Sequence, residues 1–157
     1  MKEKEYIIFL IEELSKEFPD ICYVIDGHSL TDAILTPDQS LLNREVDVFK
    51  SIVQDLPSRV QILSIIGEQL KIKIPTYDLC ALFIGSIGSG GVIPCWMLKK
   101  PAVMYGPPWM YKWVREQEAR VPEGGPYARF VESWEIEDGF DFDRLKLLEM
   151  CKLVLSR

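Results

Sequence analysis

The sequence predicts an α/β fold, a Rossmann-like three-layer sandwich in which a mostly parallel sheet has helices on both faces. Short apolar runs alternate with longer amphipathic segments along the 157 residues, as in a chain of βαβ units. The runs are continuously apolar, which is typical of parallel strands covered on both faces. A hydrophobic content of 48% with 27% charged residues indicates one globular domain over residues 1–157.

The first helix and strand are predicted from hydrophobic spacing. Residues 2–18 form an amphipathic helix that ends at Pro19, and residues 21–25 form a strand. The apolar side chains of this helix recur every three or four residues: Ile7, Leu10, Ile11, Leu14 and Phe18.

A second helix is predicted to begin at Thr36 and to end at Pro57. Thr36 is a capping residue, Pro37 suits the first helical position, and Gln39 completes a capping box. One face of the helix is expected to be lined by Leu42, Val46, Phe49 and Val53.

A strand over residues 60–66 and a short helical or irregular piece up to Ile74 follow. Pro75 then introduces residues 78–107, which are predicted to form one βαβ unit. Its parts are a strand over 79–84, a loop of glycine and serine, a helix over 92–98 with Pro94 in its first turn, and a strand over 102–105.

The last third of the chain is predicted to contain an edge strand and a closing helix. The edge strand covers residues 127–134, and either Asp141 or Asp143 caps the helix. The acidic residues of this region are expected to form a solvated edge: Glu132, Glu135, Glu137 and Asp138.

Composition excludes some classes of function. A net charge of −6 argues against a nucleic-acid partner, whose phosphates require a basic surface. No apolar run is long enough for a membrane span. The four cysteines are widely spaced and predict free thiols in a reducing compartment, so a cytoplasmic location is expected. No cofactor and no metal site is expected.

The loop between the strand over 79–84 and the following helix is the first candidate site. Backbone N–H groups of small residues can approach a phosphate closely, and a helix start attracts anions. The spacing of its glycines does not match a dinucleotide fingerprint or a P-loop, so a tight turn that packs a helix on a sheet is an equal alternative. The predicted ligand-binding residues of the loop are Ser86, Gly88, Ser89, Gly90 and Gly91.

The turn Asp26-Gly27-His28 follows the first strand and is the second candidate site. In a parallel sheet, ligands bind beyond the carboxyl ends of the strands. His28 is a candidate base, Asp26 a candidate base or ribose partner, and Gly27 a candidate binding residue. A surface histidine beside a turn-forming Asp-Gly pair is the alternative.

A third turn, residues 105–109, is expected at the same edge of the sheet. Trp109, like Trp96, Tyr111 and Trp113, could stack on a base or a sugar, and contact with another subunit is the alternative, because tryptophan is enriched at interfaces. Cys95, beside the glycine loop, is a further candidate as a nucleophile.

Several segments resemble the C-terminal, donor-binding half of GT-B glycosyltransferases. They are FPDICYVIDG, IPTYDLCALFIGSIGSGGVIPCWMLKKPAVMYGP and FDFDRL, in this order along the chain. The resemblance implies a nucleotide-sugar donor, UDP- or GDP-linked, which the loop, His28, Tyr105 and Trp109 would contact. It also implies that transfer needs a second domain or subunit for the acceptor.

The chain departs from that family in the small-residue loop, which lacks the acidic residue that often holds the ribose. The alternative function is a non-catalytic Rossmann-like interaction module that forms homo-oligomers through its aromatic surface.

Overall fold

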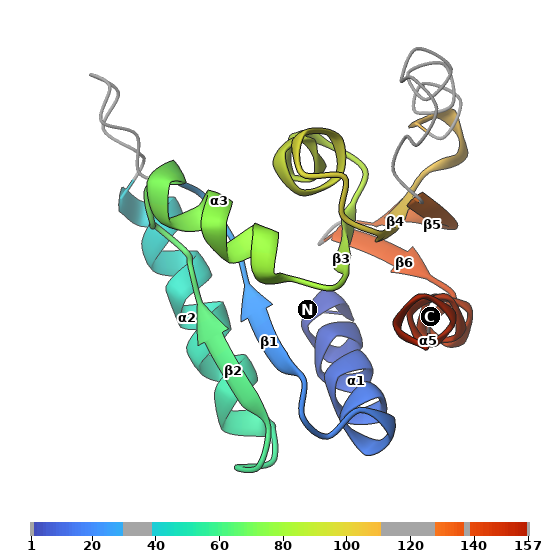
Figure 1. The fold of residues 1–157 in the computed structure, drawn as a ribbon, viewed down its shortest axis with the longest axis horizontal. Coiled ribbons are helices and arrows are strands. Elements are labelled where there is room, and N and C mark those ends of the chain that lie inside the picture. The colour runs from blue at the N-terminus through green and yellow to red at the C-terminus, as the bar shows by residue number, and fades with distance from the viewer. Residues whose placement is uncertain (1, 30–38, 111–127, 137–138, 157) are drawn as a thin grey trace. The chain divides into compact units, whose positions relative to one another are not determined.

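A computed structural model describes residues 2–29, 39–110, 128–136 and 139–156 (Figure 1). The chain divides into two compact units, one of residues 4–75 and one of residues 76–157 together with 1–3. The predicted α/β class is confirmed, and the finer three-layer arrangement within one domain stays a prediction. Among the described residues, no helix is both long enough and apolar enough to cross a bilayer.

The unit of residues 4–75 is built on a two-stranded parallel sheet. Its elements are α1 (Lys2–Glu17), β1 (Cys22–Ile25), α2 (Gln39–Asp55), β2 (Gln61–Ser64) and the first part of α3 (Leu70–Leu79). Strands β1 and β2 pair in register from Cys22 opposite Gln61 to Ile25 opposite Ser64. Parallel strands need a crossover connection, and α2 lies within it.

Helices α1 and α2 pack together with this sheet through one apolar cluster. Ile11 of α1 lies against Ile52 at the end of α2, and Leu56 follows directly after that helix. Tyr23 and Ile25 of β1 and Ile62 of β2 pack against them. The helix predicted over 2–18 is therefore confirmed, with Leu10, Ile11 and Leu14 buried as expected.

The predicted face of α2 is partly wrong. Val53 is 39% exposed, whereas Ile52 is 1% exposed and lies in the core. The core-facing row is Val48, Ile52 and Leu56, each four residues after the last, so the buried stripe is rotated from the predicted one. The capping residues Thr36 and Pro37 lie outside the described residues.

Pro75 does not end a helix, contrary to prediction. Helix α3 runs from Leu70 through Pro75 to Leu79. A proline removes one backbone donor, and the turn that follows it is held by Tyr77, which is 8% exposed. As a result Leu79 is a helical residue with 89% exposure, and the strand predicted over 79–84 begins only at Phe83.

The unit of residues 76–157 contains a four-stranded sheet in the order β3-β4-β5-β6. The strands are β3 (Phe83–Ser86), β4 (Ala102–Gly106), β5 (Ala128–Ile136) and β6 (Gly139–Phe142). The first three run parallel, and β6 returns antiparallel to β5. Helix α5 (Arg144–Leu155) and the helical turn of residues 92–97 lie on opposite sides of this sheet (Figure 1).

The helix predicted over 92–98 is a shorter and wider element. Ser89–Gly91 forms a tight 3₁₀ turn, and Val92–Met97 forms a π-type turn whose last bond joins Leu98 N–H to the Ile93 carbonyl at 3.0 Å. Lys100 N–H donates to the Pro94 carbonyl at 2.9 Å. Lys99, the residue before Lys100, has a left-handed backbone conformation with φ 55°. Cys95, which is 0% exposed, anchors the turn in the core.

The hairpin β5–β6 is longer than the single edge strand predicted over 127–134. The strand β6 was not predicted, although Asp138-Gly139 is a turn signal in the sequence. Asp143, one of the two predicted caps, is the N-cap of α5 and accepts hydrogen bonds from the N–H groups of Leu145 and Lys146, both at 3.0 Å.

Candidate functional site

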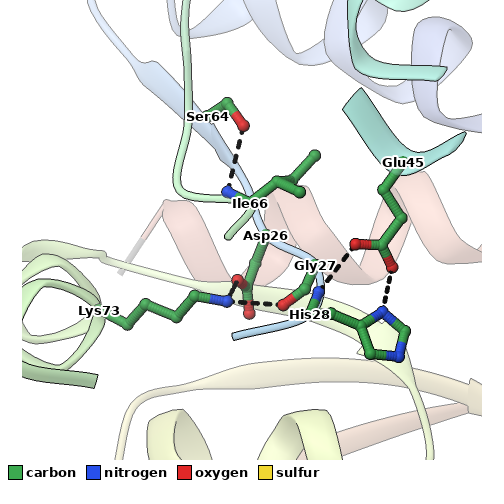
Figure 2. A network of polar contacts seen from close by, with 7 residues as sticks. All are labelled: Asp26, Gly27, His28, Glu45, Ser64, Ile66 and Lys73. Carbon is green, nitrogen blue, oxygen red and sulfur yellow. Dashed lines mark hydrogen bonds and ion pairs between the residues drawn. The ribbon is translucent and has the colours of Figure 1, made fainter. Parts of the chain in front are cut away.

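A cluster of polar side chains lies where β1 ends in the unit of residues 4–75 (Figure 2). Asp26, Gly27 and His28 directly follow β1, and the chain after β2 stays paired with them. Ile65 N–H bonds to the Ile25 carbonyl at 2.9 Å, and Gly67 N–H bonds to the His28 carbonyl at 2.8 Å. The structure therefore brings the three predicted residues of this turn together and fixes their backbone.

Lys73 of α3 is joined to Asp26. Its Nζ lies 2.6 Å from Asp26 Oδ1 and 2.6 Å from the Gly27 carbonyl oxygen. The Lys73 side chain is 1% exposed and that of Asp26 is 28% exposed. A buried ammonium is stable only when it is paired and hydrogen-bonded, and Asp26 and Gly27 supply those partners.

Glu45 of α2 holds His28 with both oxygens of its carboxylate. Oε2 accepts from the His28 backbone N–H at 2.9 Å, and Oε1 lies 2.5 Å from His28 Nδ1. The Glu45 side chain is 26% exposed, and that of His28 is 60% exposed. Figure 2 shows the second ring nitrogen on the side of the imidazole away from Glu45.

Gly27 leaves the space that the Glu45 carboxylate occupies. A Cβ atom at this position would lie 2.5 Å from Glu45 Oε2 and 3.1 Å from Ile66 Cγ1. A side chain at position 27 would therefore displace the Glu45 carboxylate from its contact with the turn.

The arrangement gives the two predicted bases different roles. Asp26 accepts a charge-assisted hydrogen bond from Lys73, so its carboxylate is held in place by the Lys73 ammonium group. His28 has one nitrogen directed at a carboxylate and an exposed ring, which is the form of a base oriented by an acid.

Sequence reasoning missed Glu45 and Lys73, although both carry a signal. Glu45 lies three residues after Leu42 and seven before Ile52, so it is a charge on the core-facing stripe of α2. Lys73 lies four residues before the buried Tyr77 on α3. A charged residue on an apolar helical stripe indicates a buried partner.

The second candidate site is the loop after β3, in the unit of residues 76–157. Ser86, the last residue of β3, is paired with Tyr105 of β4, so the carboxyl ends of the two parallel strands are adjacent. Ile87 N–H extends this pairing to the Tyr105 carbonyl at 2.8 Å, and Gly91 N–H closes the turn on the Gly88 carbonyl at 3.2 Å.

The glycines of this region differ in their surroundings, because one is packed against β4 and two are exposed. A Cβ at Gly91 would lie 2.7 Å from Met104 Cε, so this glycine allows the turn to pack on β4. A Cβ at Gly88 or Gly90 would meet no atom within 4 Å among the described residues, and both glycines are exposed. Neither has a positive φ, a property that among the described glycines belongs to Gly67.

The two aromatic residues of the third predicted turn differ in exposure. The Tyr105 ring is 8% exposed and lies 4.5 Å from the Phe142 ring, centroid to centroid. Trp109 is 63% exposed. Trp109 is thus available to a ligand or partner, whereas Tyr105 belongs to the packing of the sheet.

Cys95 is a core residue. It is 0% exposed and packs with Ile87, Ala102 and Met104. Burial raises the pKa of its thiol to about 11, so the thiolate that a nucleophile needs is not formed near neutral pH. The structure excludes Cys95 as a solvent-accessible nucleophile.

Comparison of the chain with known protein families, with curated proteins and with solved structures finds no match.

Proposed function

We propose that the chain is a glycosyltransferase-like domain that binds a UDP- or GDP-linked sugar through the loop of residues 86–91. The observation that carries the proposal is the space above Gly88 and Gly90, which no atom of the described part of the chain occupies within 4 Å of a Cβ placed there. Neither packing nor a left-handed backbone requires glycine at these positions, so the absence of side chains there keeps the backbone accessible. Access to backbone N–H groups is what a diphosphate requires.

The position of the loop supports the same conclusion. In parallel α/β sheets, ligands bind beyond the carboxyl ends of strands, and the loop follows β3 where β3 and β4 end side by side. The strand-loop-turn-strand order of β3, residues 87–97 and β4 is the part of the chain that resembles the donor-binding half of GT-B enzymes. We include Ser86, Gly88, Ser89, Gly90 and Gly91 in the proposed diphosphate site, with a Rossmann-like arrangement around it.

Transfer would proceed by displacement at the anomeric carbon of the donor. A base removes the proton of the acceptor hydroxyl, the acceptor oxygen forms a bond to the anomeric carbon, and the bond from that carbon to the diphosphate oxygen breaks. The nucleoside diphosphate leaves with the electron pair, and backbone N–H groups stabilise the charge that develops on it. We assign the binding of the acceptor to a separate domain or subunit, and His28 of the unit of residues 4–75 stays a candidate for the base.

A ligand panel tests the proposal. Purified chain is heated with UDP, GDP and a set of UDP- and GDP-sugars, and unfolding is followed by fluorescence. A ligand at about ten times its Kd stabilises the folded chain by about 1.4 kcal/mol, which raises Tm by about 3 °C or more in a chain of this size. No shift with any nucleotide or nucleotide-sugar at millimolar concentration removes the proposal.

Exposed apolar side chains favour a second candidate, an interaction module that pairs through its aromatic surface. In the unit of residues 76–157, Trp96 is 40% exposed, Met97 62% and Trp109 63%. Tryptophan and methionine are enriched where proteins meet. Light scattering across a range of concentrations tests this candidate, since self-association raises the mean mass and a constant monomer mass opposes it.

A further inference from the structure

We propose that Glu45 is a positioning residue that holds neutral His28 as the Nδ1–H tautomer, so that Nε2 is the nitrogen that accepts a proton. The histidine tautomer is set by the hydrogen bond that the other ring nitrogen makes. An ionised carboxylate only accepts hydrogen bonds. Because Glu45 Oε1 faces Nδ1 at 2.5 Å, the ring proton belongs on Nδ1.

The second contact of Glu45 makes this orientation specific. The same carboxylate accepts the His28 backbone N–H through Oε2 at 2.9 Å, so backbone and ring are held by one group. A single contact to the ring would leave the residue free to turn about its backbone. Two contacts fix the chain direction at His28 together with its side-chain rotamer.

Neighbouring residues hold Glu45 and the turn in place. Gly27 has no side chain where Glu45 Oε2 lies, and Lys73 ties the Gly27 carbonyl and the Asp26 carboxylate to α3 at 2.6 Å each. The charge of Asp26 is compensated by Lys73, so Glu45 is the carboxylate that acts on the imidazole. The turn is thereby held from α2 on one side and from α3 on the other.

An imidazole arranged in this way takes a proton from a hydroxyl at Nε2, and the carboxylate stabilises the imidazolium that results. The His28 side chain is 60% exposed, so a substrate hydroxyl can approach it. The tautomer follows from the contacts alone, whereas the role of Nε2 as the base for an acceptor hydroxyl rests on the proposed glycosyltransferase function.

The chain offers a direct test because His28 is its only histidine. Long-range ¹H–¹⁵N correlation spectra of uniformly labelled protein, recorded where the imidazole is neutral, report the protonated nitrogen of a single ring. The wild-type spectrum is expected to show the Nδ1–H pattern. Glu45→Ala is expected to lose that pattern and to shift toward Nε2–H, the form that predominates in free histidine.

Asp47→Ala on the same helix is the matched control. Asp47 is an exposed carboxylate whose partner is Lys50 at 3.6 Å, so its removal is expected to leave the wild-type pattern unchanged. A wild-type spectrum with the Nε2–H pattern overturns the proposal, as does an unchanged pattern in Glu45→Ala. The wild-type spectrum decides the tautomer even if Glu45→Ala does not fold, and no nucleotide is needed, so the result is separate from the ligand panel.

Discussion

Lys73 Nζ lies 2.6 Å from Asp26 Oδ1, and the two side chains are buried to very different degrees. The lysine is 1% exposed and the aspartate 28% exposed. If one partner is removed, the other loses this ion pair, and the cost depends on how much water reaches its charge. The pair therefore has an asymmetry that mutation can measure.

Asp26→Ala is expected to destabilise the chain more than Lys73→Met. The first change leaves a buried ammonium with only the Gly27 carbonyl, at a cost of about 3 kcal/mol, whereas the second leaves a carboxylate that water reaches, at a cost of about 1–2 kcal/mol. Urea unfolding of both variants gives the two free energies of unfolding. The double variant completes a cycle, and equal single costs with no coupling would show that the pair is not formed.

Two buried thiols predict how stability depends on pH. Burial raises the pKa of Cys95 to about 11 and that of Cys151 to about 12, from 9.0. Between pH 9 and the pKa of each thiol in the folded chain, the unfolded chain loses a thiol proton that the folded chain keeps. The folded state then binds more protons, so the free energy of unfolding falls as pH rises. The stabilisation that comes from the raised thiol pKa values is fully present below pH 9. Above pH 9, each thiol lowers the free energy of unfolding by up to about 1.4 kcal/mol per pH unit, until its pKa in the folded chain is reached.

The comparison of Cys151→Ala with the wild type isolates this effect. The free energy of unfolding of the variant is expected to decline less steeply above pH 9, while Cys22→Ala, at an exposed position, keeps the wild-type slope. A thiol reagent at neutral pH is likewise expected to modify Cys22 before Cys95 and Cys151. Parallel slopes in all three proteins would contradict the prediction.

Alanine substitution is expected to destabilise the chain at Gly106 and to have almost no effect on stability at Gly88. A Cβ at Gly106 would lie 2.7 Å from Ile87 Cδ1 and 3.2 Å from its Cβ, so Gly106→Ala overpacks the core at a cost of about 1–3 kcal/mol. Gly88→Ala meets open space and is expected to change stability by less than about 0.5 kcal/mol. Thermal unfolding of the two variants without ligand checks this difference.

Lys99→Gly is expected to stabilise the chain. Lys99 has φ 55° where the π-type turn ends, and a left-handed conformation costs a non-glycine residue about 1 kcal/mol relative to glycine. Lys100→Gly is the control, because Lys100 pairs with Asp78 at 3.1 Å and its loss is not expected to stabilise. A Tm of Lys99→Gly at or below that of the wild type would oppose the prediction.

Hydrophobic spacing is sufficient to predict the elements whose buried residues follow a regular pattern along the sequence. The helix over 2–18 is predicted because Leu10, Ile11 and Leu14 lie on one face, and Asp143 is a recognisable cap before the last helix. The strands at 22–25 and 61–64 lie within the predicted ranges, with shorter ends.

The remaining features depend on contacts that are distant in sequence. Pro75 indicates a helix end by local chemistry, but the burial of Tyr77 keeps α3 helical to Leu79. The roles of Glu45 and Lys73 arise from pairs separated by 17 and 47 residues. A charge on a helical stripe indicates that a buried partner exists, but it does not identify which residue that partner is. The sequence predicts His28 and the glycine loop as candidate site residues, whereas the partners of the turn at His28 are identified only in the structure.

The proposed function requires the loop after β3 to bind the diphosphate of a nucleotide. Calorimetric titration of UDP and GDP into the wild type and into Gly88→Val tests it most directly, once equal unfolding free energies show that the variant is folded. We expect one of the two nucleotides to bind the wild type and to bind the variant at least about tenfold more weakly, a loss of about 1.4 kcal/mol. Equal affinity for both proteins, or no binding of either nucleotide at millimolar concentration, would contradict the account.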